Sequence, residues 1–227
     1  MKTRRQERRA GFTLLDLMTL VAVVAIFAVL AFPILVQSAA DARTALCAGN
    51  MGQVGRAVLM YSDEHNGVLP GNQHSQPSWV DGLAKYSSTN SYRCPDEAIS
   101  GRHARAYTIA LNDFLTPHPY GARQFDFSKR SSIVAPMETM MFTESADDYR
   151  AYDHFHFADA RENGYEPNAF AEQADVERHG GAANYLFADG HVDGLAWSSG
   201  AKPKLVFPGS RFVNPAGHLV RAEVAGK

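Results

Sequence analysis

The chain has 227 residues, of which 45% are hydrophobic and 20% charged, and its formal net charge is −2. This composition is typical of a globular domain with an appendage and argues against a chain that is disordered throughout. Five basic residues and one acidic residue lie among the first eleven, so the rest of the chain is more acidic than the whole. Such a chain lacks the cationic surface on which general nucleic-acid binding depends, and we exclude nucleic acid as a partner of the folded part.

An apolar segment follows the basic residues. Asp16 is the only charged residue between Phe12 and Val36, and Leu17 to Val36 are twenty residues without a charge. Twenty helical residues extend about 30 Å, which matches the hydrocarbon core of a bilayer. Because basic residues precede the segment, its N-terminal end should be cytoplasmic. We therefore expect a cytoplasmic segment over 1–11, a single inner-membrane span over 12–36, and a periplasmic chain after it.

Three interpretations of this segment compete. A secretory signal peptide would be cut near Ala39 and Ala40, but its apolar region is about 7 to 15 residues long, shorter than here. The Arg8-Arg9 pair alone is little support for a twin-arginine signal. A plain uncleaved anchor explains length and orientation but not Asp16, since a carboxylate at the edge of a span costs roughly 1 to 3 kcal/mol unless it is paired.

The third interpretation rests on a motif. Gly11-Phe12-Thr13-Leu14-Leu15-Asp16, followed by the apolar run with Pro33, resembles the cleavage and methylation signal of type IV prepilins and type II secretion pseudopilins. The resemblance implies that a prepilin peptidase removes 1–11 as a leader peptide and methylates Phe12. It also implies that Asp16, where the family usually has Glu, pairs with the new N-terminal ammonium of a neighbouring subunit.

Pro33 lies within the helical run, where it predicts a kink or local melting. Filament pilins carry a proline at this position, although transmembrane helices also tolerate proline without a special role. The helix should continue over 37–66, to about Glu64, with Gly67 supplying the C-terminal cap.

The continued helix has one apolar face, which should pack on a head. This face comprises Leu46, Cys47, Met51, Val54, Ala57, Val58 and Tyr61. The periodicity places Gly49, Gly52 and Gly55 on the opposite side. There they either allow another helix to approach closely or mark a weak helix.

From 67 to 227 short apolar stretches alternate with Gly, Pro, Ser and Asn, which predicts a small α+β head with an antiparallel sheet. We expect strands over 105–111 and 139–143, a hairpin over 182–196, and an irregular insertion over about 145–177. Asp189-Gly190 favours a two-residue type I′ turn, which pairs Phe187 with Val192 on the face toward the long helix.

The two cysteines are Cys47 and Cys94. An even count in an oxidising compartment favours a disulfide bond, which would stabilise the fold by about 4 kcal/mol. The alternative is a pair of ordinary buried thiols. Two cysteines alone do not make a zinc pattern.

A second motif lies near the C-terminal end of the predicted sheet. His179, nine further residues and then Asp189-Gly190 resemble the His-x9-Asp-Gly motif of a processing-associated domain often joined to prepilin leaders. Other residues of that family occur in the same order: Cys47, Asn50, Tyr61, Gly67, Pro70, Trp79, Arg93–Pro95, Tyr107, Asn112 and Phe187–Val192. The resemblance implies a pilin-like fold and a filament-associated role rather than a reaction.

Metal binding and catalysis have little support in the sequence. If 182–188 is a strand, His179 and Asp189 lie at its opposite ends, more than about 20 Å apart, and cannot share one ion. A structural calcium held by loop carboxylates is the remaining candidate cofactor, with Asp147, Asp148, Asp153 and Asp159 as ligands. Because no phosphate loop, nucleophile elbow, Cys-x-x-Cys or His-Glu-x-x-His is present, we expect no enzyme.

The sequence therefore predicts a major or minor structural subunit of a type IV pilus or type II secretion-like filament, which leaves the inner membrane on assembly. Its expected partners are a prepilin peptidase, other pilin or pseudopilin subunits, and an assembly ATPase with its membrane platform. The alternative is an extracytoplasmic enzyme or metal-binding protein with an uncleaved membrane anchor.

Overall fold

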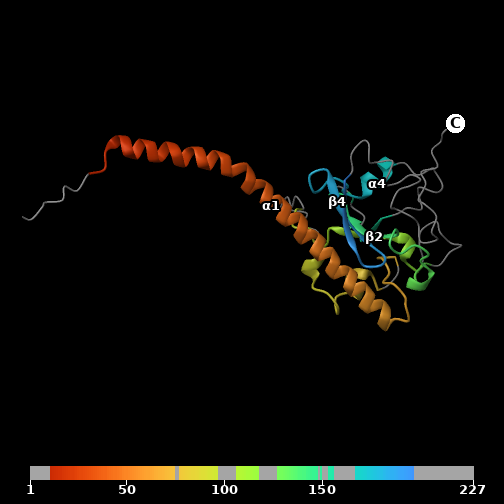
Figure 1. Ribbon diagram of the computed structural model, residues 1–227. Coiled ribbons are helices and arrows are strands. Elements are labelled where there is room, and N and C mark those ends of the chain that lie inside the picture. Colours follow the sequence, from red (N-terminus) through yellow and green to blue (C-terminus); the bar gives the residue numbers. More distant parts are fainter. Residues whose placement is uncertain are drawn as a thin grey trace, which may run out of the picture. The chain divides into compact units, whose positions relative to one another are not determined.

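The protein belongs to the α+β class and combines one long helix with a five-stranded sheet (Figure 1). The computed structural model describes residues 11–74, 77–96, 106–117, 127–147, 149, 153–155 and 167–196. The chain divides into two compact units, Met1–Ala42 and Arg43–Lys227. The second unit begins inside the long helix α1, Leu14–Glu64, so the helix from Arg43 onward is part of the head.

Helix α1 is continuous from its first to its last residue, including the turn around Pro33. Of the two outcomes predicted at Pro33, local melting does not occur, and a kink stays a prediction. The predicted end at Glu64 is confirmed, but the residue that terminates the helix is Asn66, with a left-handed φ of 56°. The Gly67 N–H donates to the Ser62 carbonyl at 2.8 Å, which makes this a Schellman motif with Asn66 in the position usually taken by glycine.

The five strands lie in the order β3-β1-β2-β4-β5. Their bounds are β1 Ile109–Asn112, β2 Met140–Glu144, β3 His154–Phe155, β4 Ala182–Phe187 and β5 Val192–Ala196. Three neighbouring pairs are antiparallel, but β3 runs parallel to β1, so the sheet is mixed rather than antiparallel as predicted. The other helices within the described residues are short: α2 Trp79–Gly82, η1 Thr89–Tyr92, η2 Asp113–Leu115, η3 Arg130–Ser132 and α4 Pro167–Gln173.

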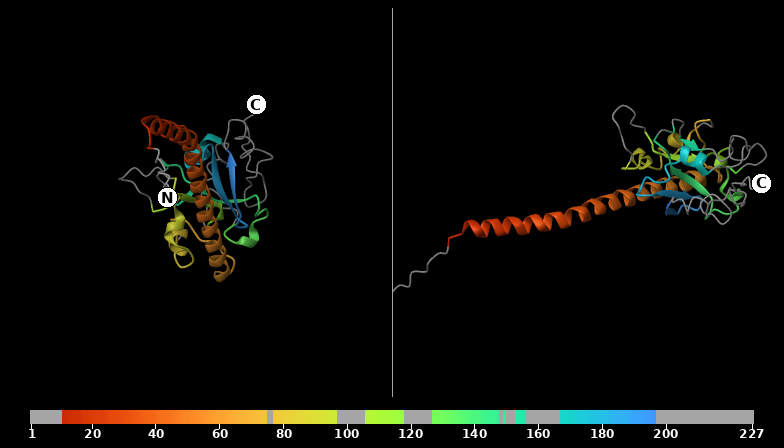
Figure 2. Two further views of the ribbon diagram at one scale, coloured as in Figure 1. Left: turned by 60° about the vertical axis from the view of Figure 1, so that its left-hand side comes forward. Right: turned by 90° about the horizontal axis from the view of Figure 1, so that it is seen from above.

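Each face of the sheet is covered by a different helix. Alternate residues of β4 belong to different cores, with Leu186 in the core beneath α1, and Tyr185 and Phe187 in the core with Phe170 of α4. Figure 2 shows the part of α1 within the head lying along the sheet. Trp79 is fully buried in the α1 core, where its ring meets Tyr92 and Phe142 edge-on with centroids 5.0 and 5.1 Å apart.

The β4–β5 hairpin forms as predicted, but its register is shifted. Leu186 is opposite Val192, and the Phe187 N–H donates to the His191 carbonyl at 2.9 Å. The loop therefore has three residues, with a positive φ of 96° at Gly190 rather than at two positions. Since a shift of one residue exchanges the two faces, Phe187 points away from α1 and the predicted pairing of Phe187 with Val192 was wrong.

The buried face of α1 also differs from the predicted face at two positions. Leu46 is 60% exposed, whereas Gly55 is buried. A Cβ atom on Gly55 would lie 2.8 Å from Cδ1 of Leu186, closer than real Cβ contacts allow. Gly55 therefore allows close approach of the hairpin of its own head, and its placement on the opposite stripe was wrong.

Candidate functional site

The residues of the proposed processing site lie directly before α1. Gly11, Phe12 and Thr13 are outside helices and strands, and the Phe12 side chain is 78% exposed. The Gly11–Phe12 peptide bond therefore lies in accessible, irregular backbone, the kind of segment in which proteolysis concentrates. The predicted leader, apart from Gly11, lies outside the described residues.

Asp16 has a role in the start of α1 that the sequence reasoning missed. The Thr13 N–H and hydroxyl donate to Asp16 Oδ2 at 2.9 and 2.7 Å. In return the Asp16 N–H donates to the Thr13 hydroxyl at 3.2 Å. This reciprocal pair is a capping box with Asp in place of Glu, and Thr-x-x-Asp before an apolar run is its sequence signal. Asp16 therefore stabilises the helix start even in a single chain.

The first half of α1 presents apolar side chains on all sides. Every described residue from Phe12 to Val36 is exposed in the isolated chain. By length and composition this helix can cross a membrane, as a membrane anchor or as a signal sequence. An all-apolar helix that packs on nothing within its own chain requires lipid or other helices around it.

Three predicted residues, Cys47, Cys94 and His179, meet Glu144 inside the head. Cys47 of α1, Cys94 after η1, Glu144 at the end of β2 and His179 before β4 place one ligand atom each within 4.8 Å of one another. The Cys47 thiol donates to Glu144 Oε1 at 2.6 Å, and His179 Nε2 lies 2.8 Å from the same oxygen. The Cys94 sulfur lies 3.7 Å from His179 Nε2. We call these four residues the Cys–Glu–His cluster.

Of the two alternatives predicted for the cysteines, the structure contains the buried thiols and not the disulfide. Cys47 and Cys94 are both free and buried. Each sulfur instead has a polar partner in the cluster, Glu144 for Cys47 and His179 for Cys94.

A layer of hydrogen bonds orients the cluster. Asp96 Oδ2 accepts a hydrogen bond from His179 Nδ1 at 3.1 Å, which directs Nε2 toward the sulfurs. Asp96 is itself held by Arg43, whose Nε donates to Oδ1 at 2.5 Å. The Asn184 N–H donates to Glu144 Oε2 at 3.2 Å and fixes the other end of that carboxylate. The side chains of His179 and Glu144 are 1% and 0% exposed, so these contacts are sheltered from water.

The cluster shifts the pKa values of its own groups. Burial opposes protonation of His179, but hydrogen bonds to Cys94 and Glu144 outweigh it and raise the pKa of His179 to about 10. A side-chain hydrogen bond between the two cysteines lowers the pKa of Cys94 to about 7, although burial acts in the opposite direction. The same hydrogen bond, together with burial and the Glu144 charge, raises the pKa of Cys47. Cys94 is therefore the cysteine that ionises first.

The other predicted motif residues lie apart from the cluster. Strand β4 separates His179 from Asp189 and Gly190, as the sequence predicted. Asp189 accepts a hydrogen bond from the His191 N–H at 3.1 Å within the hairpin loop. The motif therefore marks the two ends of one strand rather than one site.

The candidate calcium ligands do not form a common site in the described part of the chain. Asp147 pairs with Arg178 at 2.8 Å, whereas Asp153 is buried and accepts a hydrogen bond from the Ser78 hydroxyl at 2.8 Å. Asp148 and Asp159 lie outside the described residues. Among the described residues, the Cys–Glu–His cluster is the one group of three or more His, Cys, Asp or Glu side chains that could hold a metal ion.

Several residues on which the resemblance to the processing-associated domain rests make hydrogen bonds that stabilise the fold. The Asn50 amide donates to the Arg93 carbonyl at 2.9 Å and joins α1 to the segment before Cys94. The Trp79 indole donates to the Asp153 carbonyl at 2.6 Å. These contacts explain the residues without assigning them a reaction.

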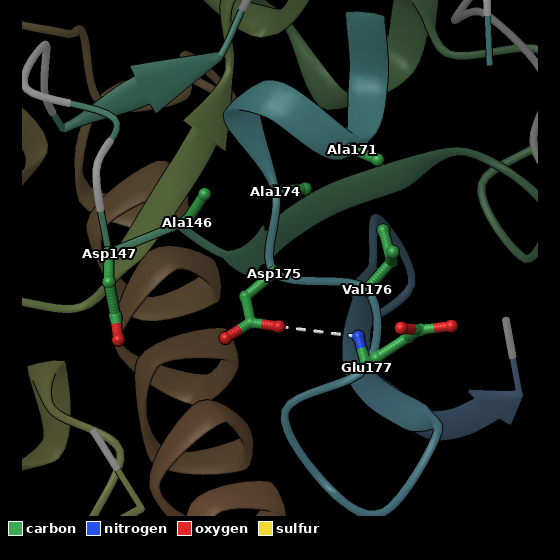
Figure 3. A pocket seen from close by; sticks show the side chains of 7 residues that line it. All are labelled: Ala146, Asp147, Ala171, Ala174, Asp175, Val176 and Glu177. Atoms are coloured by element: carbon green, nitrogen blue, oxygen red, sulfur yellow. Dashed lines mark hydrogen bonds between the residues drawn. The ribbon is translucent and has the colours of Figure 1, made fainter. Parts of the chain in front are cut away.

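One open pocket of about 280 Å³ lies beside α4 (Figure 3). Asp147, Asp175 and Glu177 line it, and the Glu177 N–H donates to Asp175 at 3.3 Å. Arg178 pairs with both Asp147 and Asp175, at 2.8 and 3.0 Å. One guanidinium thus pairs with two of the three carboxylates that line this pocket.

Ser78, Asp153 and His154 also meet, but not in the order that nucleophilic catalysis needs. The Ser78 hydroxyl donates to Asp153 Oδ2, while His154 Nδ1 lies 2.8 Å from Asp153 Oδ1. A serine nucleophile is activated by a base within hydrogen-bond reach of its hydroxyl, and here the carboxylate takes that place. Ser78 also caps α2 by accepting from the Val80 N–H, which is a structural role.

Comparisons with protein-family models, curated proteins and solved structures found no match for this chain.

Proposed function

We propose that this chain is a structural subunit, a pilin or pseudopilin, of a type IV pilus or type II secretion-like filament. The observation that carries the proposal is the exposed Gly11–Phe12 bond directly before a helix that is apolar on all sides and has Asp16 in its first turn. A prepilin peptidase cuts that bond and methylates Phe12. The protein performs no reaction of its own.

Processing preserves the start of the helix. Thr13 and Asp16 both lie after the cut, so the capping box remains in the mature chain. Both donors on Thr13 use Oδ2 of Asp16. The carboxylate can therefore cap its own helix and pair through Oδ1 with the Phe12 ammonium of an adjacent subunit, which removes two charges from an apolar environment.

Assembly uses the same apolar surface twice. In the inner membrane the exposed side chains of 12–36 face lipid, and in the filament they face the equivalent helices of other subunits. The head is periplasmic and remains outside the filament core, in a pilin-like arrangement of helix and sheet. Other subunits, an assembly ATPase and its membrane platform are the partners that this mechanism needs.

The mature N-terminus provides the direct test. We expect the chain extracted from membranes to begin with N-methylated Phe12 when its intact mass and N-terminal peptide are measured by mass spectrometry. A chain that keeps Met1, or one that begins near Asp41, would refute processing by a prepilin peptidase.

Three variants separate the capping role of Asp16 from its role in assembly. Asp16→Asn keeps an oxygen that can cap the helix but removes the charge, so we expect processed, folded protein and no filaments. Thr13→Ala weakens the cap by about 0.5 to 2 kcal/mol but keeps the charge, so filaments should form. Asp16→Glu keeps both functions and should also assemble. Filaments of normal yield from Asp16→Asn, counted by electron microscopy of sheared fractions, would contradict the pairing.

An extracytoplasmic metal-binding protein or enzyme with an uncleaved anchor is the second candidate, because the Cys–Glu–His cluster offers metal ligands. The capping box gives Asp16 a purpose in such an anchor too. The two candidates differ at the N-terminus, since only the second leaves Met1 in place.

A further inference from the structure

We propose that Cys47, Cys94, Glu144 and His179 bind one zinc ion in a closed structural site that fastens α1 to the sheet. This inference goes beyond the proposed function and does not depend on it, since a filament subunit and an anchored protein could each carry the site.

The ligand set fits zinc. Zinc in structural sites is bound tetrahedrally by cysteine sulfur, histidine nitrogen and carboxylate oxygen. The cluster supplies four such ligands from side chains that are almost fully buried. Calcium takes six to eight oxygen ligands, so a site with two sulfurs selects a softer ion.

The geometry is close to that of a zinc site. Metal–ligand distances of about 2.0 to 2.3 Å place tetrahedral ligand atoms about 3.3 to 3.8 Å from one another. The Cys94 sulfur and His179 Nε2 are 3.7 Å apart, within this range. Glu144 Oε1 lies 2.8 Å from His179 Nε2 and 2.6 Å from the Cys47 sulfur, so this carboxylate oxygen must withdraw from them by about 0.5 to 1.2 Å.

The surroundings of His179 are those of a metal ligand. Zinc-bound histidines usually donate their second ring N–H to a carboxylate, which fixes the ring and the tautomer. Asp96 accepts from His179 Nδ1 at 3.1 Å and is anchored by Arg43, so Nε2 points at the other three ligands. The Asp96–Arg43 pair behind His179 is an observation independent of the four ligands. Two cysteines buried in an apolar core would not require a carboxylate that orients a histidine toward them.

Zinc also accounts for the charges in the cluster. Binding releases the thiol protons and the Nε2 proton to solvent, which leaves two thiolates, one carboxylate and a neutral imidazole around a divalent cation. The remaining single negative charge lies near the buried Arg178 guanidinium, which interacts electrostatically with Glu144.

The site joins segments that are far apart in the sequence. Its ligands come from α1, the segment after η1, strand β2 and the turn before β4. A zinc ion would therefore cross-link the helix to the sheet, as a disulfide would, but through four segments instead of two.

Metal content of the full-length chain, purified in mild detergent with a reductant and without chelators, tests the proposal. We expect one zinc ion per chain by inductively coupled plasma mass spectrometry. Cobalt exchanged into the site should give the intense visible absorption of tetrahedral Co(II) and a sulfur-to-cobalt charge-transfer band.

Two variants and a matched control locate the metal. Cys94→Ser and His179→Gln should lose the zinc and the cobalt spectrum, whereas His191→Gln, a histidine in the hairpin loop, should retain both. Asp96→Asn should keep the site but lower its zinc affinity about tenfold to a hundredfold in competition with a chromophoric chelator. If the ligand variants do not fold, the wild-type cobalt spectrum still decides whether sulfur binds the metal.

Three results would overturn the proposal. The first is a chain without zinc whose two thiols react freely after denaturation. The second is a Cys47–Cys94 disulfide in freshly extracted protein, identified by non-reducing peptide mapping. The third is zinc that persists in both Cys94→Ser and His179→Gln. None of these results bears on cleavage at Gly11, so the two proposals fail separately.

Discussion

Two glycines on α1 provide a quantitative test of how the helix packs on the hairpin. A Cβ atom on Gly49 would meet nothing within 4 Å, whereas one on Gly55 would lie 2.8 Å from Leu186. Alanine gains about 1 kcal/mol over glycine in a helix interior at either position. At Gly55 this gain is opposed by overpacking, which costs about 1 to 3 kcal/mol. Leu186 is fully buried and has little room to move away.

We therefore expect Gly49→Ala to stabilise the head by about 1 kcal/mol and Gly55→Ala to destabilise it by about 1 kcal/mol. Urea unfolding of the full-length chain in mild detergent, followed by tryptophan fluorescence, measures both, because Trp79 is buried in the core beneath α1. Gly55→Ala that is as stable as Gly49→Ala would refute the close approach.

A double-mutant cycle identifies the atom responsible. Leu186→Ala removes the clashing side chain at a cost of about 2 to 5 kcal/mol. In that background Gly55→Ala should become stabilising by about 1 kcal/mol, since only the helix propensity remains. An unchanged effect of Gly55→Ala would assign the strain to the backbone of the hairpin instead.

Three further predictions concern the head. Asn66→Gly should leave stability unchanged or raise it slightly, whereas Asn66→Val should lower it by about 1 to 2 kcal/mol, because the position has a left-handed φ; thermal unfolding compares the two. Trp79→Phe should cost about 1 to 3 kcal/mol in urea unfolding, followed by far-UV circular dichroism, because the Asp153 carbonyl loses its indole donor. The hydrogen bond from Lys85 lowers the pKa of Glu64, so this contact stabilises the fold above about pH 4.5 and is lost as the pH falls. Glu64→Gln should therefore flatten the acid limb of a stability–pH profile, and an unchanged limb would contradict the contact.

The sequence predicted the long helix well, because the apolar run and the helical periodicity that indicate it extend over many residues. The end of α1 follows from periodicity, and β2 and the β4–β5 hairpin lie where short apolar stretches and turn residues predicted them. Strand β1 was predicted over 105–111 but begins only at Ile109. Strand β3 and helix α4 lie in the segment expected to be irregular. A strand of two residues has no period to detect, and it forms because β1 offers it a partner.

The register of the hairpin illustrates a different limit. Asp189-Gly190 correctly marked the turn, but the choice between a two-residue and a three-residue loop depends on small differences in turn geometry. The packed state selects the three-residue loop, because it places Leu186 and Val192 against the glycines of α1. A single residue in the loop thus decided which face of β4 meets the helix.

The sequence indicated only some members of the Cys–Glu–His cluster. The expected oxidising compartment paired Cys47 with Cys94, and the motif singled out His179. Asp189 was correctly excluded as a partner of His179 in one metal site, but His179 was not predicted to meet the cysteines. Glu144 ends a strand whose position was predicted, yet pairing between β2 and β4 is what brings it to His179. Contacts between strands that are not neighbours in sequence cannot be derived from local patterns.

The position of the cluster on α1 explains why so many polar contacts gather there. The head begins at Arg43, and Cys47 is one helical turn further on. The buried face of α1 also begins at this turn, since Cys47 is the first buried residue of the helix. The Arg43–Asp96 ion pair and the cluster both act at this point, and an ion pair that is half exposed contributes about 1 kcal/mol or less. The proposed zinc ion, bound through Cys47, would therefore be the stronger restraint at this turn.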